Sequence, residues 1–247
     1  MDLKNKEKDF RIAGKELGFW KYGYALNARC NMLFGNINFK QKAMLEIGGG
    51  KGIFSIWASI HGAKDVINLE PLSDGAFDSA DVFSKFYRLK ERFGLAQIEM
   101  LPLKVQAFEC EDSRFDIILS EGSINHLDEE SCINLLNIKK ARNNYRNIFQ
   151  KFSRIMKPGG KIIIVDASSR NYYGDRKKTN PFAKKIDWKK HQEPETWASL
   201  LEEAGFQHPI ITWISPKQLR YLGIYSIPKY ISYFYKSAFR LEMTLKN

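Results

Sequence analysis

The sequence predicts an α/β fold in which helices cover both faces of a mostly parallel, doubly wound sheet. Short apolar segments typical of strands alternate along the chain with longer segments of helical periodicity. The 247 residues are 44% hydrophobic, and a chain of this length can bury roughly 70–75% of its unfolded surface in one core. No internal repeat or linker interrupts the pattern. We therefore expect a single Rossmann-like domain that spans residues 1–247.

The expected elements follow from local pattern and from proline and glycine. Apolar, strand-like segments occur at residues 43–47, 65–70, 96–100, 115–120, 161–166 and 210–214. Helical periodicity covers residues 74–93 and 139–156. A further helix begins at Pro194, with proline in its first turn, and ends before Gly205. Residues 1–40 are expected to form a helical cap.

A glycine-rich turn follows the first expected strand. Gly48, Gly50 and Gly52 have the spacing G-x-G-x-G, and a helical segment begins directly after them. Glycines at these positions allow a ligand to approach the backbone closely. Glu70 ends the second expected strand, where a carboxylate can accept hydrogen bonds from both hydroxyls of a ribose. The pattern predicts a nucleoside-cofactor site, the alternative being a turn without a ligand.

The glycine spacing distinguishes between cofactors. A dinucleotide site needs G-x-G-x-x-G, but Ile53 or Ser55 occupies the third glycine position, depending on the glycine counted first. A nicotinamide oxidoreductase is also disfavoured because its Tyr-x-x-x-Lys helix would contain glycine or proline at both matching places. The acidic residue Glu46 followed by G-x-G-x-G instead resembles motif I of the class I S-adenosylmethionine-dependent methyltransferases.

Other segments extend this resemblance. The turn Pro158-Gly159-Gly160 before an apolar strand, the strand at 115–120 and the helix end at 200–206 all match the same family. The matches run from about residue 43 to residue 214. The resemblance implies the class I methyltransferase fold, in which the alternating segment 237–244 is a last strand antiparallel to the others. It also implies S-adenosylmethionine as the cofactor.

The resemblance places the cofactor contacts by position. The glycine loop would pass the methionine part, Glu46 would help to hold its amino group, and Glu70 would accept the ribose hydroxyls. The adenine edge is expected just after the third strand, where this chain lacks the usual aspartate and we favour Gln106 and Ala107. The full predicted cofactor set is Glu46, Gly48, Gly49, Gly50, Gly52, Glu70, Pro71, Gln106, Ala107 and Ser120.

The segment after the fourth strand bears on the methyl acceptor. It has no Asn- or Asp-Pro-Pro-aromatic motif, as base-amine methyltransferases have, and none of the three cysteines follows a proline. It is more similar to enzymes that methylate small molecules or carbohydrates. His126 is a candidate general base toward an acceptor hydroxyl, or else caps the next helix or packs beneath the site. Glu121 is a second candidate, for contact with the acceptor or the cofactor, or as part of a solvated loop.

Two segments are unusually basic. Residues 170–190 contain eight Lys or Arg and two Asp, within a segment, 167–193, that is similar to methyltransferases of bacterial glycan gene clusters. A loop there is expected on the acceptor side and would suit a phosphate or carboxylate, unless it is only solvated. Residues 215–247 combine aromatic and basic side chains in a helix-like piece and the last strand. Core packing, an acceptor cover, a membrane surface or single-stranded nucleic acid would each explain them.

The whole chain carries a formal net charge of +11, which favours anionic partners, RNA among them. The first residues contain no apolar core of a signal peptide, and three cysteines without metal-site spacing fit a cytoplasmic protein with reduced thiols. We predict a methyltransferase that modifies an oxygen of a small or lipid-linked, anionic acceptor such as a sugar. An RNA methyltransferase and a non-catalytic binding protein with this fold are the alternatives.

Overall fold

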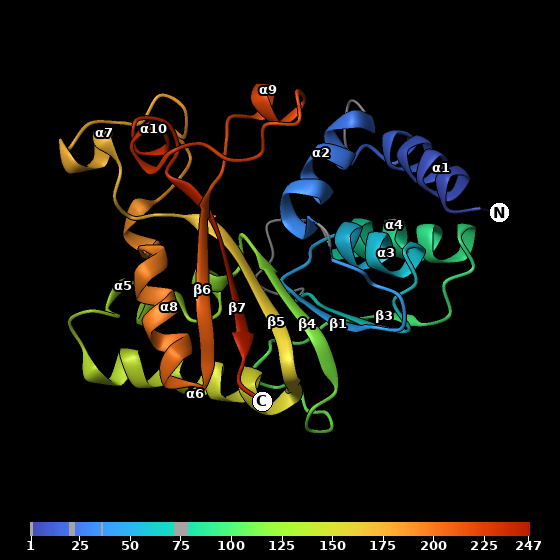
Figure 1. Cartoon of the computed structure of the whole chain (residues 1–247), viewed down its shortest axis with the longest axis horizontal. Helices are drawn as coiled ribbons and strands as arrows, with labels where there is room; N and C mark the ends of the chain where they lie inside the picture. Colours follow the sequence, from blue (N-terminus) through green and yellow to red (C-terminus); the bar gives the residue numbers. More distant parts are fainter. Residues whose placement is uncertain (1, 20–22, 36, 72–78) are drawn as a thin grey trace.

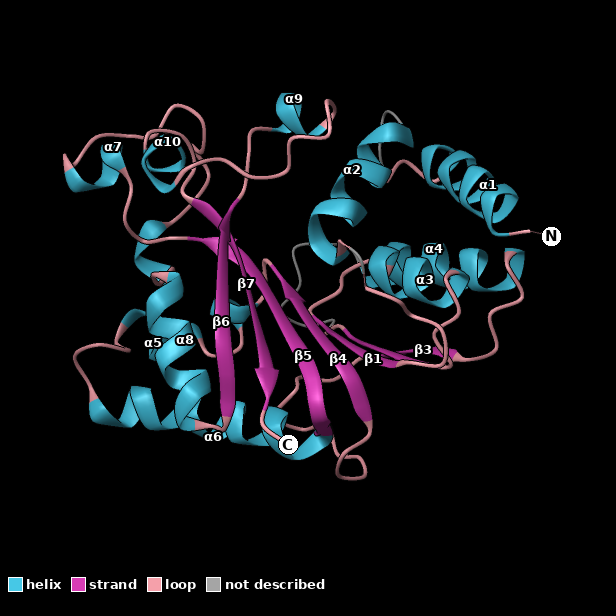
Figure 2. Ribbon diagram, viewed as in Figure 1, coloured by secondary structure: helices cyan, strands magenta, loops and turns pink. Residues whose placement is uncertain are grey.

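The computed structural model describes residues 2–19, 23–35, 37–71 and 79–247. One seven-stranded sheet runs through the molecule in the order β3-β2-β1-β4-β5-β7-β6 (Figure 2). Strands β1 to β5 pair in parallel, whereas β7 is antiparallel to both β5 and β6. The predicted fold class, with its antiparallel last strand, is therefore confirmed. The strands are β1 (Ala43–Ile47), β2 (Asp65–Leu69), β3 (Ile98–Leu101), β4 (Phe115–Glu121), β5 (Met156–Ala167), β6 (Phe206–Trp213) and β7 (Ala238–Leu245).

Helices cover both faces of the sheet and its carboxyl edge (Figure 1). The α-helices are α1 (Leu3–Glu16), α2 (Gly23–Phe34), α3 (Ile53–Ile60), α4 (Ser79–Arg92), α5 (Glu129–Ile133), α6 (Lys139–Ile155), α7 (Tyr172–Asp175), α8 (Pro194–Glu203), α9 (Lys217–Arg220) and α10 (Lys229–Tyr233). Two 3-10 turns, η1 (Ile124–His126) and η2 (Trp188–Lys190), complete them. As expected, Pro194 stands in the first turn of α8, where its missing N–H costs nothing.

The pleat of the sheet divides the core into two clusters. Leu45 of β1 packs on one face with Phe149 of α6 and Trp197 of α8. Its neighbour Met44 packs on the other face with Trp57 of α3, because successive side chains of a strand point to opposite faces. The central strands are buried on both faces, which explains why they read as continuous apolar segments.

Several boundaries differ from the predicted ones. β5 begins at Met156, which pairs with Phe115, and the bulge up to Lys161 contains the proline and glycines that were expected to lie before the strand. β6 begins at Phe206, because a bulge at His208, whose φ is 57°, interrupts the strand without ending it. The expected helix at 74–93 corresponds to α4 from residue 79, and residues 72–78 lie outside the described residues.

The parallel strands end at one edge of the sheet, and the predicted site residues lie in the segments that follow these strand ends. The segments after β1, β2 and β4 meet there, as parallel pairing requires. Figure 1 shows α2, α9 and α10 above this edge. Within the described part of the chain, no helix has the length and apolar character needed to cross a membrane.

Candidate active site

The glycine loop connects β1 to α3 at the carboxyl edge. Gly48, Gly50 and Gly52 have φ angles of 64°, 52° and 67°, a left-handed region that a Cβ disfavours. Space is a second constraint, since a Cβ on Gly48 would clash with the Cβ of Ser123, and one on Gly52 would lie 2.5 Å from the Phe86 ring. The loop therefore needs glycine for both its backbone conformation and its close packing.

Glu46 lies beneath this loop and not in a cavity. Its side chain accepts hydrogen bonds from the backbone N–H of Ser55, at 2.8 Å, and from the Ser55 hydroxyl. The residue is 1% exposed, and burial raises the pKa of its carboxyl to about 8. It lines neither of the two large cavities described below. In this conformation Glu46 shapes the loop, and its contact with the cofactor stays a prediction.

Asn68 of β2 is a buried polar residue that the sequence analysis missed. A Cβ on Gly49 would lie 2.6 Å from its Oδ1 and also 2.6 Å from the Glu46 carboxyl carbon. Neither polar atom of the Asn68 side chain has a hydrogen-bond partner among the described residues. Asn68 and Glu46 thus form a polar floor under the glycine loop. A single Asn inside an apolar strand was the available signal.

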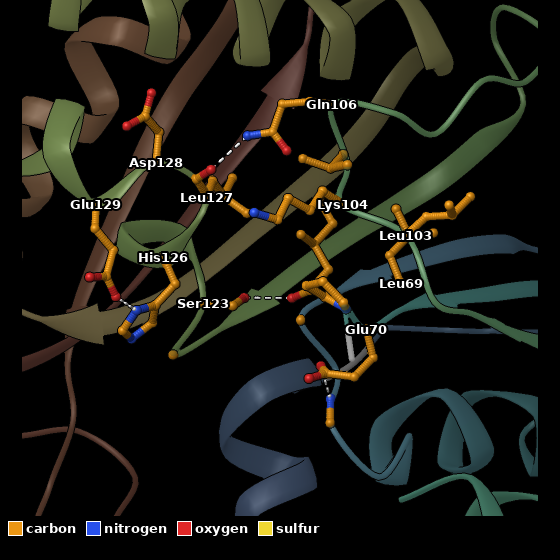
Figure 3. A pocket seen from close by; sticks show the side chains of 16 residues that line it. Leu69, Glu70, Leu103, Lys104, Gln106, Ser123, His126, Leu127, Asp128 and Glu129 are labelled. Atoms are coloured by element: carbon orange, nitrogen blue, oxygen red, sulfur yellow. Dashed lines mark hydrogen bonds and ion pairs between the residues drawn. The ribbon is translucent and has the colours of Figure 1, made fainter. Parts of the chain in front are cut away.

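The first cavity has a volume of about 770 Å³ and opens beside the glycine loop. Figure 3 shows Glu70, Gln106 and His126 arranged around it. Glu70 Oε2 accepts the Gly50 N–H at 2.8 Å, and burial raises the pKa of the Glu70 carboxyl. Gln106 Nε2 donates to the Leu127 carbonyl oxygen at 2.6 Å. The apolar side chains Leu69, Leu103 and Val105 lie in the same lining.

This lining fits a nucleoside. One cavity contains the Glu70 carboxylate, which can accept hydrogen bonds from ribose hydroxyls, and an apolar wall against which a base can pack. The Gln106 amide lies where it can reach the edge of that base. Pro71 lines the cavity beside Glu70, and its contact with the cofactor stays a prediction. Ala107 lies in an exposed turn and does not line the cavity, and Ser120 is fully buried with its hydroxyl 2.8 Å from that of Ser123. The structure does not bring these two residues to the cavity.

His126 lines the first cavity from η1. Its Nδ1 lies 2.6 Å from Oε1 of Glu129, whose other oxygen accepts from Lys190 Nζ at 2.6 Å. Lys190 first, and then His126, lower the pKa of the Glu129 carboxyl. A carboxylate at Nδ1 favours the tautomer with the proton on that nitrogen, so Nε2, which lies 3.4 Å from the Asn125 side-chain nitrogen, is the ring nitrogen that can accept a proton.

A second cavity, of about 720 Å³, shares Gly48, Gly50 and Gly122 with the first. Its walls are formed by α2 and the residues just after α1, by the glycine loop with the start of α3, and by α9. Glu121 lines it and forms an ion pair with Arg29 of α2. The two candidate catalytic residues, His126 and Glu121, therefore belong to different cavities that meet at the glycine loop.

The positive charge of the second cavity comes from residues that the sequence analysis did not assign. Its cationic side chains are Arg29, Lys51, Lys217 and Arg220, from α2, the glycine loop and α9. No residue of the basic segment 167–193 lines either large cavity. The only sequence signal for Lys217 and Arg220 was the basic, aromatic composition of residues 215–247.

Comparison with known proteins gives the family. The methyltransferase domain family matches residues 19–208. A putative S-adenosylmethionine-dependent methyltransferase from Listeria monocytogenes has 16% identity and a TM-score of 0.60, covering 90% of this chain and 99% of its own. Phosphoethanolamine N-methyltransferase 2 of Haemonchus contortus, solved with S-adenosyl-L-methionine, has 15% identity and a TM-score of 0.61. The match covers 96% of this chain and 56% of that chain.

A geranyl diphosphate methyltransferase solved with the same cofactor has 13% identity and a TM-score of 0.58, with 90% of this chain and 84% of that chain covered. At this level of identity the structures show a shared fold, and the family match covers most of the chain. The glycine loop, Glu70 and the strand order agree with both findings. The chain belongs to the class I methyltransferases, enzymes that use S-adenosylmethionine as their cofactor.

Proposed function

We propose that the enzyme transfers a methyl group to an oxygen of a small, anionic acceptor such as an acidic sugar. The observation that carries this proposal is the second cavity, which adjoins the first cavity and is lined by four cationic side chains and one carboxylate, Glu121. Its volume of about 720 Å³ lies in the range of small-molecule sites. An acceptor bound there would meet the cofactor at the shared glycines.

Different residues of the chain would bind the two parts of the cofactor. Gly48, Gly50 and Gly52 would let the methionine part approach the backbone, and Glu70 would accept the ribose hydroxyls. Bound S-adenosylmethionine supplies an electrophilic methyl group on its sulfonium. Alignment of the acceptor with this methyl group contributes a large part of the rate, on the order of 7–11 kcal/mol in well-oriented systems.

His126 is the proposed general base, and because it lines the first cavity, it would act on an acceptor hydroxyl that reaches past the shared glycines from the second. It would accept the acceptor's hydroxyl proton at Nε2 while Glu129, held by Lys190, keeps the Nδ1 proton in place. The carboxylate of Glu129 would also stabilise the imidazolium that forms. Oxygen acceptors need such a base more than amines do, because a neutral hydroxyl is a weak nucleophile.

A matched pair of variants tests this role. His126→Asn should lower kcat about 10²- to 10⁴-fold, the usual contribution of a general base, with S-adenosylhomocysteine affinity unchanged. The control is His208→Asn, at an exposed residue with a positive φ that asparagine tolerates. Turnover would be followed with sugar phosphates, uronic acids and neutral sugars from pH 5 to 9. Full turnover of His126→Asn at every pH would exclude the base.

A lipid-linked acceptor is the second candidate, and a surface feature favours it. Around α9 and α10, Leu222, Tyr230 and Phe234 are exposed, Leu222 to 75%. No Asp or Glu occurs between residues 204 and 241, whereas Lys217 and Lys229 stand among these side chains. Exposed aromatic and aliphatic groups beside cations suit an anionic membrane surface.

Vesicle flotation tests the lipid-linked form of the proposal. We expect binding to vesicles with 30% anionic lipid to fall severalfold in the double variant Leu222→Ser, Phe234→Ser. Leu136→Ser is the control, because Leu136 is 68% exposed but lies between α5 and α6. Equal flotation of wild type and double variant, or none of the wild type, would remove the membrane form and leave the water-soluble acceptor.

A further inference from the structure

Helix α9 and the residue that follows it bring two unusual polar groups to the second cavity. The Arg220 guanidinium is partly buried, and its Nη1 lies 3.3 Å from the Met32 sulfur, which is only a weak acceptor. Burial lowers the pKa of Arg220, and the positive charge of Arg29 lowers it further. No carboxylate of the described residues forms an ion pair with Arg220. A guanidinium in such surroundings is costly until an anion compensates it.

The neighbouring residue, Tyr221, has a buried hydroxyl. Its oxygen finds no hydrogen-bond partner among the described residues, although the residue lines the cavity. The ring is fixed by an edge contact with Tyr24, at 4.7 Å between centroids, and Lys217 Nζ lies 5.6 Å from its centroid. A buried hydroxyl without a partner is the kind of group that a ligand satisfies.

The other two cations of the cavity already have acidic partners. Arg29 forms its ion pair with Glu121, and Lys51 Nζ lies 3.7 Å from Asp81. Lys51 also belongs to the glycine loop, where the methionine end of the cofactor is expected. Arg220 and Lys217 come from the segment after β6 and have no carboxylate partner among the described residues. The negative charge of Glu121 raises the pKa of Arg220 by less than burial and Arg29 lower it, so an anion in the cavity would meet its least compensated charge at α9.

We propose that Arg220, Tyr221 and Lys217 form the site that binds the carboxylate or phosphate group of the methyl acceptor. Arg220 supplies a planar, two-pronged donor for either anion, the Tyr221 hydroxyl donates a further hydrogen bond, and Lys217 adds charge at the exposed side. This inference rests on the proposed function, because it names the group by which that acceptor is recognised. The carboxylate of the cofactor's methionine part is the other anionic group that could bind to these residues.

The experiment uses Arg220→Gln, Tyr221→Phe and the control Lys64→Gln, an exposed lysine outside both cavities. Binding of inorganic phosphate, S-adenosylhomocysteine and 5′-methylthioadenosine, which lacks the carboxylate, would be measured without turnover at constant ionic strength. Phosphate affinity should fall about 10-fold or more in Arg220→Gln and about 2- to 10-fold in Tyr221→Phe. Affinities for both nucleosides should stay within twofold, and the control should match wild type.

Two results would overturn the inference. If Arg220→Gln weakens S-adenosylhomocysteine but not 5′-methylthioadenosine, the guanidinium holds the cofactor's carboxylate. If wild type fails to bind phosphate, or both variants bind it unchanged, there is no anion site at α9. Tyr221→Phe keeps the ring packing, so its result stands if Arg220→Gln does not fold. Because no turnover is measured, these results stay separate from a failure of methyl transfer itself.

Discussion

Replacing Glu70 with glutamine should weaken S-adenosylhomocysteine binding by about 10- to 150-fold. The Glu70 carboxyl lines the first cavity and is 8% exposed, and one of its oxygens accepts the Gly50 N–H at 2.8 Å. The remaining acceptor positions are available to two ribose hydroxyls. Hydrogen bonds to a charged group contribute about 1.5–3 kcal/mol, which converts to the stated factor. Glutamine retains one acceptor oxygen, so Glu70→Ala should lose more.

Isothermal titration calorimetry would measure this effect, with thermal unfolding to confirm that each variant folds. Glu99→Gln is the control, because Glu99 is an exposed glutamate on the adjacent strand β3. Burial raises the pKa of Glu70, so wild-type affinity should increase as pH rises through that pKa, and the affinity of Glu70→Gln should not. A folded Glu70→Gln protein with wild-type affinity would refute the assignment of the ribose to this residue.

Two stability predictions follow from the glycine loop and its floor. Gly48→Ala should lower the free energy of unfolding, measured in urea, by about 2–5 kcal/mol, because of the positive φ and the clash with Ser123. Gly94 is the control: it has a similar φ but open space around it, so Gly94→Ala should lower this free energy by only about 1–2 kcal/mol. Equal losses would contradict the packing argument. Glu46 has a folded-state pKa near 8 against an ordinary 4.5, so unfolding releases its proton between these values. Wild-type stability should therefore fall from about pH 5 to pH 8, by up to a few kcal/mol relative to Glu46→Gln, and parallel pH profiles would refute the buried, protonated carboxyl.

Local pattern was sufficient for the fold class and for several residues that line the first cavity. Gly48 and Glu70 stand directly after β1 and β2, where the parallel sheet itself determines which edge they reach, and Gly50 follows in the same loop. The bulges at Lys161 and His208 were not predicted, because a bulge keeps the hydrogen-bonded ladder going through residues that read as turns. Ala107 and Ser120 were chosen by position alone, and position does not fix the direction of a side chain.

The sequence by itself determined the order of strands and helices, the glycine loop and the family, because these depend on neighbouring residues and on backbone conformation. Only the tertiary structure decided which side chains share a cavity. Arg29 and Glu121 are 92 residues apart, and Arg220 reaches the same cavity from the segment after β6. The burial of Glu46 under Gly49 was decided in the same way. Such contacts arise when the sheet brings distant strand ends to one edge, and no local pattern records which residues will face one another there.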